Sequence, residues 1–179
     1  MEINLSWMYP GLLSLHGERG SVQAFEKVAK NLGVTLNVKK VENFEDNVDL
    51  ENTDIMLFLP GELKVIEQIK RALEKQDLNK YIEAQKYLIC VGTTGSLLAK
   101  EIVREDGTKI EGLGILDMNV QERKMVIGDD LHFYINQTKQ EIIGSQIQMI
   151  DIERKNVEPL GYTIYGYGNT RKNRRRCKV

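Results

Sequence analysis

The sequence predicts an α/β fold: a mainly parallel sheet built from alternating strands and helices, with β-hairpin additions in the C-terminal half. Up to about Val103, short apolar runs alternate with segments whose apolar residues repeat at helical spacing. Beyond Val103 the segments are short, punctuated by glycine and rich in Ile, Val and aromatic residues, which is typical of hairpins. Strands that alternate with helices imply right-handed crossovers and a parallel sheet.

The first sixty residues hold three expected strands and one helix. "EINLSWMY" is the first strand and ends at Pro10-Gly11. Ser21 is expected to cap a helix that Gly33 ends, because glycine is common just after a helix. "VTLNVKKV" alternates as a half-buried strand does, and the continuous apolar run from Ile55 to Leu59 suits a strand covered on both faces.

The next segments extend the same alternation before the pattern changes. Helical spacing from Val65 to Leu73 predicts a second helix, "KYLICVG" a further buried strand, and "SLLAKEIV" another helix. Hairpin or meander strands are expected in "DGTKIEGLGILDM", "RKMVIGDDLHFYI" and "EIIGSQIQMID", with a turn at Asp106-Gly107. "GYTIYGYGN" is expected to be an edge strand followed by a loop, where Tyr162, Tyr165 or Tyr167 could stack on a ligand.

Charge divides the chain into an acidic body and a basic tail. Six of the 25 basic residues lie in the last nine, which leaves 19 against all 26 acidic residues in residues 1–170. We therefore expect one domain over 1–170 and a disordered tail over 171–179. An acidic body without stripes of basic and aromatic residues does not predict a nucleic-acid binder.

Location and metal chemistry are constrained by what the composition lacks. No apolar run is long enough to span a bilayer, and the N-terminus lacks a basic-then-apolar signal peptide. Two cysteines, Cys90 and Cys177, have no metal-like spacing, and the chain has only two histidines. These features predict a cytoplasmic protein without a metal site or cofactor.

Two loops follow buried strands and precede helical segments, "PGE" at Pro60 and "CVGTTGS" at Cys90. In an open α/β sheet, ligands bind beyond the carboxyl ends of the strands, where these loops would lie. A helix dipole would favour the Cys90 thiolate, and the backbone N–H groups of Gly61 or Val91 could form an oxyanion hole. The alternative is that Cys90 is a small apolar side chain in a buried strand.

Other candidates carry weaker signals. "GTTGS" could present N–H and hydroxyl groups to an anion, but it lacks the Lys-Ser/Thr that completes a nucleotide-binding P-loop, and a capped tight turn explains the same residues. His16 lies in a glycine-flanked loop, and His132 interrupts a strand-like run. Neither has a carboxylate partner at a readable spacing, so we expect surface or turn positions.

Three segments together resemble one family: "YPGLLSLHGERGSVQAFEKVAKNLGV", "EDGTKIEGLGILDM" and "YGYGN". They are similar to GatD-like subunits of lipid II isoglutaminyl synthase, in the CobB/CobQ-like branch of the class I glutamine amidotransferases. The resemblance covers Met1 to about Asn169. It implies a three-layer, flavodoxin-like α/β domain that hydrolyses L-glutamine and passes ammonia to a Mur-ligase-like (MurT-like) partner in a heterodimer. Cys90 would be its nucleophile, and Gly61 would lie at the oxyanion hole.

The chain departs from that family at the residues that carry the chemistry. The family elbow is Cys-Gly-Gly-Tyr-Gln, whereas Cys90 is followed by Val91 and Gly92. Counting back without gaps from "EGLGILD" puts Gly92, not Cys90, at the nucleophile position. The glutamine-binding segment, expected near 144–152, lacks the family's His and Arg, and the catalytic His expected after "YGYGN" is replaced by "TRKNRRRCKV".

These departures leave three hypotheses. The chain is a GatD-like subunit whose glutaminase activity is lost or very weak, either a pseudoenzyme or a truncated form. Alternatively, it is an active glutaminase that uses Cys90 with a base from a partner chain. The third possibility is an α/β module without enzymatic activity that binds an anion or a nucleotide through Gly92 to Ser96.

Overall fold

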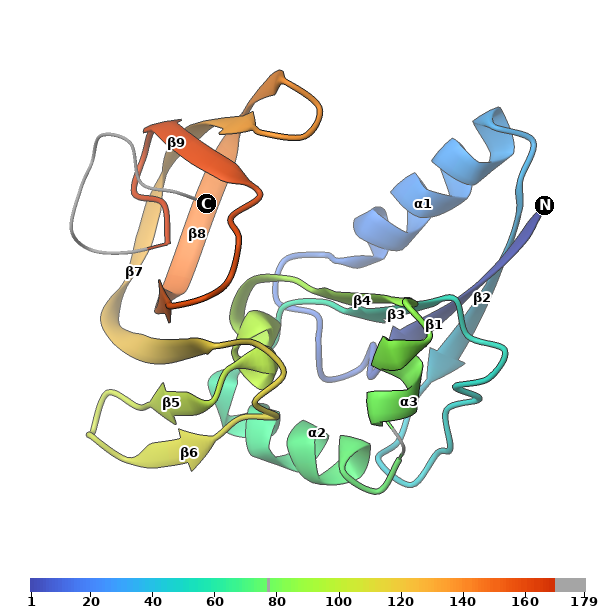
Figure 1. The fold of residues 1–179 in the computed structure, drawn as a ribbon, viewed down its shortest axis with the longest axis horizontal. Coiled ribbons are helices and arrows are strands. Elements are labelled where there is room, and N and C mark those ends of the chain that lie inside the picture. The colour runs from blue at the N-terminus through green and yellow to red at the C-terminus, as the bar shows by residue number, and fades with distance from the viewer. Residues whose placement is uncertain (77, 170–179) are drawn as a thin grey trace. The chain divides into compact units, whose positions relative to one another are not determined.

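A computed structural model describes residues 1–76 and 78–169 and divides the chain into two compact units, Met1–Leu97 and a second that begins at Leu98. Each unit has its own sheet (Figure 1). The α/β class, with its parallel sheet and C-terminal hairpins, is confirmed. The basic tail over 171–179 lies outside the described residues. No helix among the described residues is long and apolar enough to cross a membrane.

The first unit contains a four-stranded parallel sheet in the order β2-β1-β3-β4. Its elements are β1 (Glu2–Met8), α1 (Arg19–Asn31), β2 (Thr35–Val41), β3 (Ile55–Phe58), the 3-10 turn η1 (Leu63–Val65), α2 (Ile66–Leu73), α3 (Leu78–Glu83) and β4 (Tyr87–Cys90). The chain moves outward from β1 to β2 on one side and from β3 to β4 on the other. The switch point, where ligands bind in such sheets, therefore lies between β1 and β3.

Helices cover both faces of this sheet, with α1 on one side and α2 and α3 on the other (Figure 1). Alternate strand residues point to opposite faces. Leu5, Trp7 and Leu57 pack with Val22 of α1. Met56 and Phe58 are fully buried and point the other way, toward the α2 side. The apolar run at 55–59 was therefore correctly assigned to a strand covered on both faces.

The predicted helix start at Ser21 was wrong. Helix α1 begins at Arg19, its N-cap is Glu18, and no side chain caps it. The Glu18 carboxylate instead accepts the backbone N–H of His16 at 2.7 and 2.8 Å, so it closes the turn before the helix. The predicted helix end was right, because Gly33 has a φ of +68° and its N–H donates to the Lys30 carbonyl.

The helix predicted over "SLLAKEIV" is absent. The 3-10 helix η2 (Gly92–Leu98) is followed directly by strand β5 (Glu101–Val103). β-Branched Ile102 and Val103 suit a strand, and β5 pairs with a neighbour on each side. Pairing across the sheet overrides a helical spacing that spans only about two turns.

The second unit is a five-stranded mixed sheet in the order β6-β5-β7-β8, with β9 paired to β7. Its strands are β5, β6 (Lys109–Glu111), β7 (Met118–Ile135), β8 (Gln140–Arg154) and β9 (Gly161–Tyr165). Strands β7 and β8 form one long antiparallel hairpin, whose register shifts between Glu122 and Ile127. The predicted hairpin strands and the strand at "GYTIY" are confirmed.

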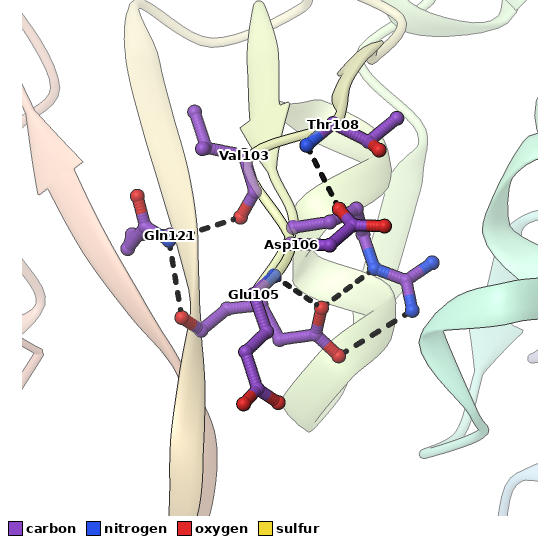
Figure 2. Close-up of polar contacts among 7 residues, drawn as sticks. Val103, Glu105, Asp106, Thr108 and Gln121 are labelled. Atoms are coloured by element: carbon purple, nitrogen blue, oxygen red, sulfur yellow. Dashed lines mark hydrogen bonds and ion pairs between the residues drawn. The ribbon is translucent and has the colours of Figure 1, made fainter.

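The predicted turn at Asp106-Gly107 joins β5 to β6 and is held against β7 by polar contacts (Figure 2). Gly107 has a φ of +87°, and the Asp106 carboxylate accepts the Thr108 N–H at 2.8 Å. The Glu122 carboxylate of β7 pairs with Arg104 Nε at 2.6 Å and accepts the Glu105 N–H at 2.9 Å. Arg104 holds the pKa of Glu122 below its usual value despite desolvation, so this link stays ionised at neutral pH.

Candidate functional site

Three loops meet at the carboxyl edge of the parallel sheet. They follow β1 (residues 9–13), β3 (60–62) and β4 (91–94). The four residues singled out by the sequence, Gly61, Cys90, Val91 and Gly92, lie in or directly beside the last two loops. Because this edge contains the switch point between β1 and β3, the fold places them where an α/β sheet carries its ligand.

Cys90 is the last residue of β4 and pairs in register with Phe58 of β3. It is a free cysteine, only partly exposed. Burial raises the pKa of its thiol to about 12, so the thiol is neutral at physiological pH. Desolvation therefore disfavours the thiolate that a nucleophile requires at this position.

The turn after β4 has its apex at Gly92, two residues beyond Cys90. Gly92 has a φ of +61° and begins η2. A Cβ at this position would lie 3.3 Å from Cγ of Pro60, so the backbone conformation and the close approach both favour glycine. In a nucleophile elbow the residue at the sharp turn carries the nucleophile. Here that residue is Gly92, which has no side chain.

Both expected oxyanion donors already have partners. The Val91 N–H donates to the Phe58 carbonyl at 2.9 Å. The Gly61 N–H donates to Oγ1 of Thr93 at 3.2 Å, and the same hydroxyl donates to the Gly61 carbonyl at 2.6 Å. The Thr93 hydroxyl thus occupies the position from which a substrate oxygen would accept the Gly61 N–H.

The loop after β1 closes on Gly61 from another direction. A Cβ on Gly61 would lie 2.4 Å from Cδ2 of Leu13 and 3.2 Å from the Leu12 carbonyl oxygen. Leu13 is fully buried, and the N–H groups of Leu12 and Leu13 both donate to the Tyr9 carbonyl. Gly61 is thus surrounded by protein atoms, and its lack of a side chain serves the packing of these loops.

The remaining hydroxyls of "GTTGS" also donate to backbone carbonyls within the fold. Thr94 Oγ1 donates to the Val91 carbonyl at 2.8 Å, and Ser96 Oγ donates to the Thr93 carbonyl at 2.7 Å. The side chains of Thr93, Thr94 and Ser96 are buried, and no lysine or arginine lies between Gly92 and Ser96. This arrangement does not favour an anion cradle.

The two histidines lie in different units of the chain. His16 precedes α1, and its backbone N–H is held by Glu18. His132 lies inside β7, and its Nε2 lies 2.9 Å from Oε2 of Glu141 on β8. No sequence spacing indicated this partner, because it is the β7–β8 hairpin that brings together two residues nine positions apart.

The C-terminal sequence motifs fall within the second sheet. Tyr162 of β9 packs against Tyr134 of β7, with ring centroids 5.1 Å apart, while Tyr165 is more than half exposed. The segment 144–152 lies in β8, where buried Asp151 pairs with buried Arg123 of β7. Among the described residues, no group of three or more His, Cys, Asp or Glu side chains could hold a metal ion.

Sequence reasoning missed Tyr9 and the bond between Thr93 and Gly61. Tyr9 follows β1 with a φ of +49°, which is rare for a bulky residue, and its ring packs against Phe44 and Phe58. Burial, with Asp46 and Glu45 nearby, raises the pKa of its hydroxyl to about 12. A positive φ cannot be read from a Tyr-Pro pair. The Thr93–Gly61 bond joins residues 32 positions apart, so no local pattern indicates it.

Comparison with known proteins identifies two related subunits, and no family model matches the chain. The lipid II isoglutaminyl synthase (glutamine-hydrolyzing) subunit GatD of Streptococcus pneumoniae (strain ATCC BAA-255 / R6) is 25% identical over 94% of this chain and 66% of the relative. The corresponding subunit of Staphylococcus aureus (strain N315) is 26% identical over 88% of this chain and 64% of the relative. The chain thus spans just under two thirds of the length of these relatives. It is a distant homologue of the GatD subunit of lipid II isoglutaminyl synthase.

Proposed function

We propose that this chain is a GatD-like subunit that assembles with a Mur-ligase-like (MurT-like) partner in the amidation of a glutamate on the cell-wall precursor lipid II. We further propose that its own glutaminase activity is lost or very weak. The first part rests on the distant homology to two GatD subunits. The second rests on two observations: Gly92 stands at the apex of the turn after β4, and the Thr93 hydroxyl accepts the Gly61 N–H. This role would place the chain in the cytoplasm.

Hydrolysis of the glutamine side-chain amide by a thiol needs a thiolate, a base that activates it, and donors for the developing oxyanion. The Cys90 thiol is held neutral, which removes the nucleophile at physiological pH. The N–H groups of Gly61 and Val91 already donate within the fold. The thiolate and the oxyanion donors are therefore unfavourable for two different physical reasons, which supports the proposal.

The scarcity of bases supports the same proposal. The chain has two histidines. The backbone of His16 is fixed by Glu18, and the ring of His132 bonds to Glu141 within the second unit. Neither makes a hydrogen bond to Cys90 among the described residues. A GatD-like subunit of this kind would serve its partner by binding it, and the partner would take free ammonia as the nitrogen donor.

The test is to co-express the chain with the Mur-ligase-like protein of the same organism and to supply lipid II and ATP. We expect the two proteins to copurify in equal amounts. Amidation should proceed with ammonium chloride and fail with glutamine, and Cys90→Ala should change neither rate. The desolvated, neutral thiol of Cys90 predicts that the substitution changes neither rate.

Two results would contradict the proposal separately. Glutamine-dependent amidation that Cys90→Ala abolishes would show an active glutaminase and overturn the loss of activity. Failure to copurify, with both proteins folded, would overturn the partner assignment. Saturable ATP binding by the isolated chain that Gly92→Val weakens would favour the anion-binding alternative instead.

A further inference from the structure

Strand β8 is an unusually exposed sheet edge. It is 15 residues long and, among the described residues, it pairs with β7 alone. Edge strands in monomeric proteins are normally protected by lysine, proline or a covering segment, because their unpaired backbone groups recruit other strands. From Ile142 to Met149 this strand contains no charged residue and no proline. The sequence of that stretch therefore supplies neither of the residue types that usually protect such an edge.

Apolar side chains accompany the unpaired backbone. Ile143 is 78% exposed and Ile147 is 59% exposed. Residues two apart in a strand share a face, so Ile143, Ser145 and Ile147 line one face of β8 in a row. Gly144, on the other face, has open space where a side chain would stand.

This row reads the same in both directions about Ser145. The order isoleucine, serine, isoleucine at positions 143, 145 and 147 is unchanged when the strand is reversed. Two identical antiparallel strands that cross at a twofold axis place residue i of one copy opposite residue j of the other with a constant sum of i and j. An axis at Ser145 places Ile143 opposite the second copy's Ile147, and the same pair recurs across the axis.

From this symmetry we propose that β8 pairs with β8 of a second copy of this chain, antiparallel and centred on Ser145, which makes one continuous sheet across a twofold axis. The two isoleucine pairs cover side chains that are otherwise in water. This inference goes beyond the proposed function and does not depend on it.

The remaining contacts of this register are compatible with the pairing. Glu141 would stand opposite Met149, so no carboxylate faces its own copy. Pairing would run from Gln140 to Ile150 and stop short of Ile152. That limit matches the structure, because the Ile152 N–H already donates to the Asn169 carbonyl at 2.8 Å.

The decisive experiment introduces a thiol at the axis. In a chain carrying Cys90→Ala and Cys177→Ser, the variant Ser145→Cys should form a covalent dimer under mild oxidation, seen on a non-reducing gel. Opposed residues in antiparallel strands have Cα atoms about 4.5 to 5.5 Å apart, within the range that a disulfide spans. Glu141→Cys in the same background is the matched control. Its two copies would lie eight residues apart along the strand, about 27 Å, and should not cross-link.

A second variant tests the energetics in solution. Ile147→Lys should weaken dimerisation about tenfold or more by sedimentation equilibrium, because the substitution acts at both isoleucine pairs. Met125→Lys makes the same change at an exposed apolar residue of β7, off the edge, and should leave dimerisation unchanged. Circular dichroism establishes that each variant is folded.

Three outcomes would overturn the proposal. They are a folded chain that stays monomeric at all concentrations, equal cross-linking at positions 141 and 145, and a dimer that Met125→Lys weakens as much as Ile147→Lys does. A monomer that needs the β8 edge to bind the Mur-ligase-like protein would assign the edge to that partner, and would equally exclude self-pairing.

Discussion

The carboxyl edge of the parallel sheet and the outer edge of β8 are opposites in how their backbone groups are used. At the first, the Gly61 N–H and carbonyl are both satisfied by Thr93, and the side chain of Leu13 fills the space beside Gly61. Along the second, isoleucines stand in water beside a strand that pairs on one side only. The sequence indicated a nucleophile elbow at the first edge, whereas at the second it placed the family's glutamine-binding segment, near 144–152, without the His and Arg of that segment.

The difference shows how the packing of a fold can use backbone N–H groups that a substrate would otherwise need. Buried polar groups that satisfy one another hold loops in place but leave no donor for a substrate. Unpaired backbone groups and exposed apolar side chains point instead to a partner. The first unit thus carries the proposed loss of glutaminase activity, and the second carries the proposed interface with a second copy of this chain.

The largest expected effect concerns the reactivity of Cys90. Because burial raises its pKa from an ordinary value of 9.0 to about 12, the thiolate fraction at pH 8 should be about a thousandfold lower than for an ordinary cysteine. In a Cys177→Ser chain, labelling by a thiol reagent should be slow and should rise about tenfold per pH unit through pH 11. A plateau near pH 9 would mean that the thiol is not desolvated and that the first edge is open.

The same pKa shift makes stability depend on alkaline pH. Since the folded-state pKa is raised, the protonated thiol stabilises the fold fully below pH 9, and this contribution is lost as the pH rises toward 12. Cys90→Ala should therefore flatten the fall of the unfolding free energy over that window. Equal slopes for the two chains would contradict the burial of the thiol.

The next effect tests what holds the second sheet. Asp151→Asn leaves the buried guanidinium of Arg123 without its counter-charge and should cost about 3 to 4 kcal/mol in urea unfolding. Glu153→Gln, an exposed change on the same strand, should alter stability by less than about 0.5 kcal/mol. Similar costs for the two variants would mean that the β7–β8 hairpin does not depend on this pair.

A smaller effect tests the bridge between Thr93 and Gly61. Thr93→Val keeps the shape but leaves the Gly61 N–H without an acceptor, and should cost about 2 kcal/mol. Thr93→Ser retains the hydroxyl and should cost less, measured by the same unfolding assay. If valine is tolerated better than serine, packing rather than the hydrogen bonds holds the two loops together.

The smallest effect concerns the apex of the turn. Gly92→Ala should destabilise the first unit by about 1 kcal/mol, because an L-residue is strained at a φ of +61°. Gly95→Ala is the control within the same 3-10 helix, since a Cβ there meets no atom within 4 Å and no unusual φ applies. Equal stabilities for the two variants would argue against a strained turn at Gly92.

The sequence was most informative where a pattern is local. The apolar run at 55–59, the glycine that ends α1 and the Asp106-Gly107 turn each depend on a few neighbouring residues, and the structure confirms all three. Counting without gaps also predicted that Gly92 takes the nucleophile position. In the structure, Gly92 is the residue of positive φ at this turn, and its match to the nucleophile position stays a prediction.

Contacts between distant segments could not be predicted from the sequence. The residues from Ser96 to Val103 could follow a helical or an extended path, and pairing of β5 with β6 and β7 decides it. His132 meets Glu141 only because the hairpin register places them together. In the sequence Thr93 is an ordinary turn residue, and its contact with Gly61 in the loop after β3 exists only in the folded chain.

The proposed loss of glutaminase activity is tested most directly by an electrophilic glutamine analogue. A diazoketone analogue alkylates a glutaminase thiol only where a thiolate, a base and a substrate pocket act together. After incubation of the full chain with its Mur-ligase-like partner, intact mass spectrometry should detect no adduct on Cys90. A stoichiometric adduct that glutamine prevents and Cys90→Ala removes would contradict the account.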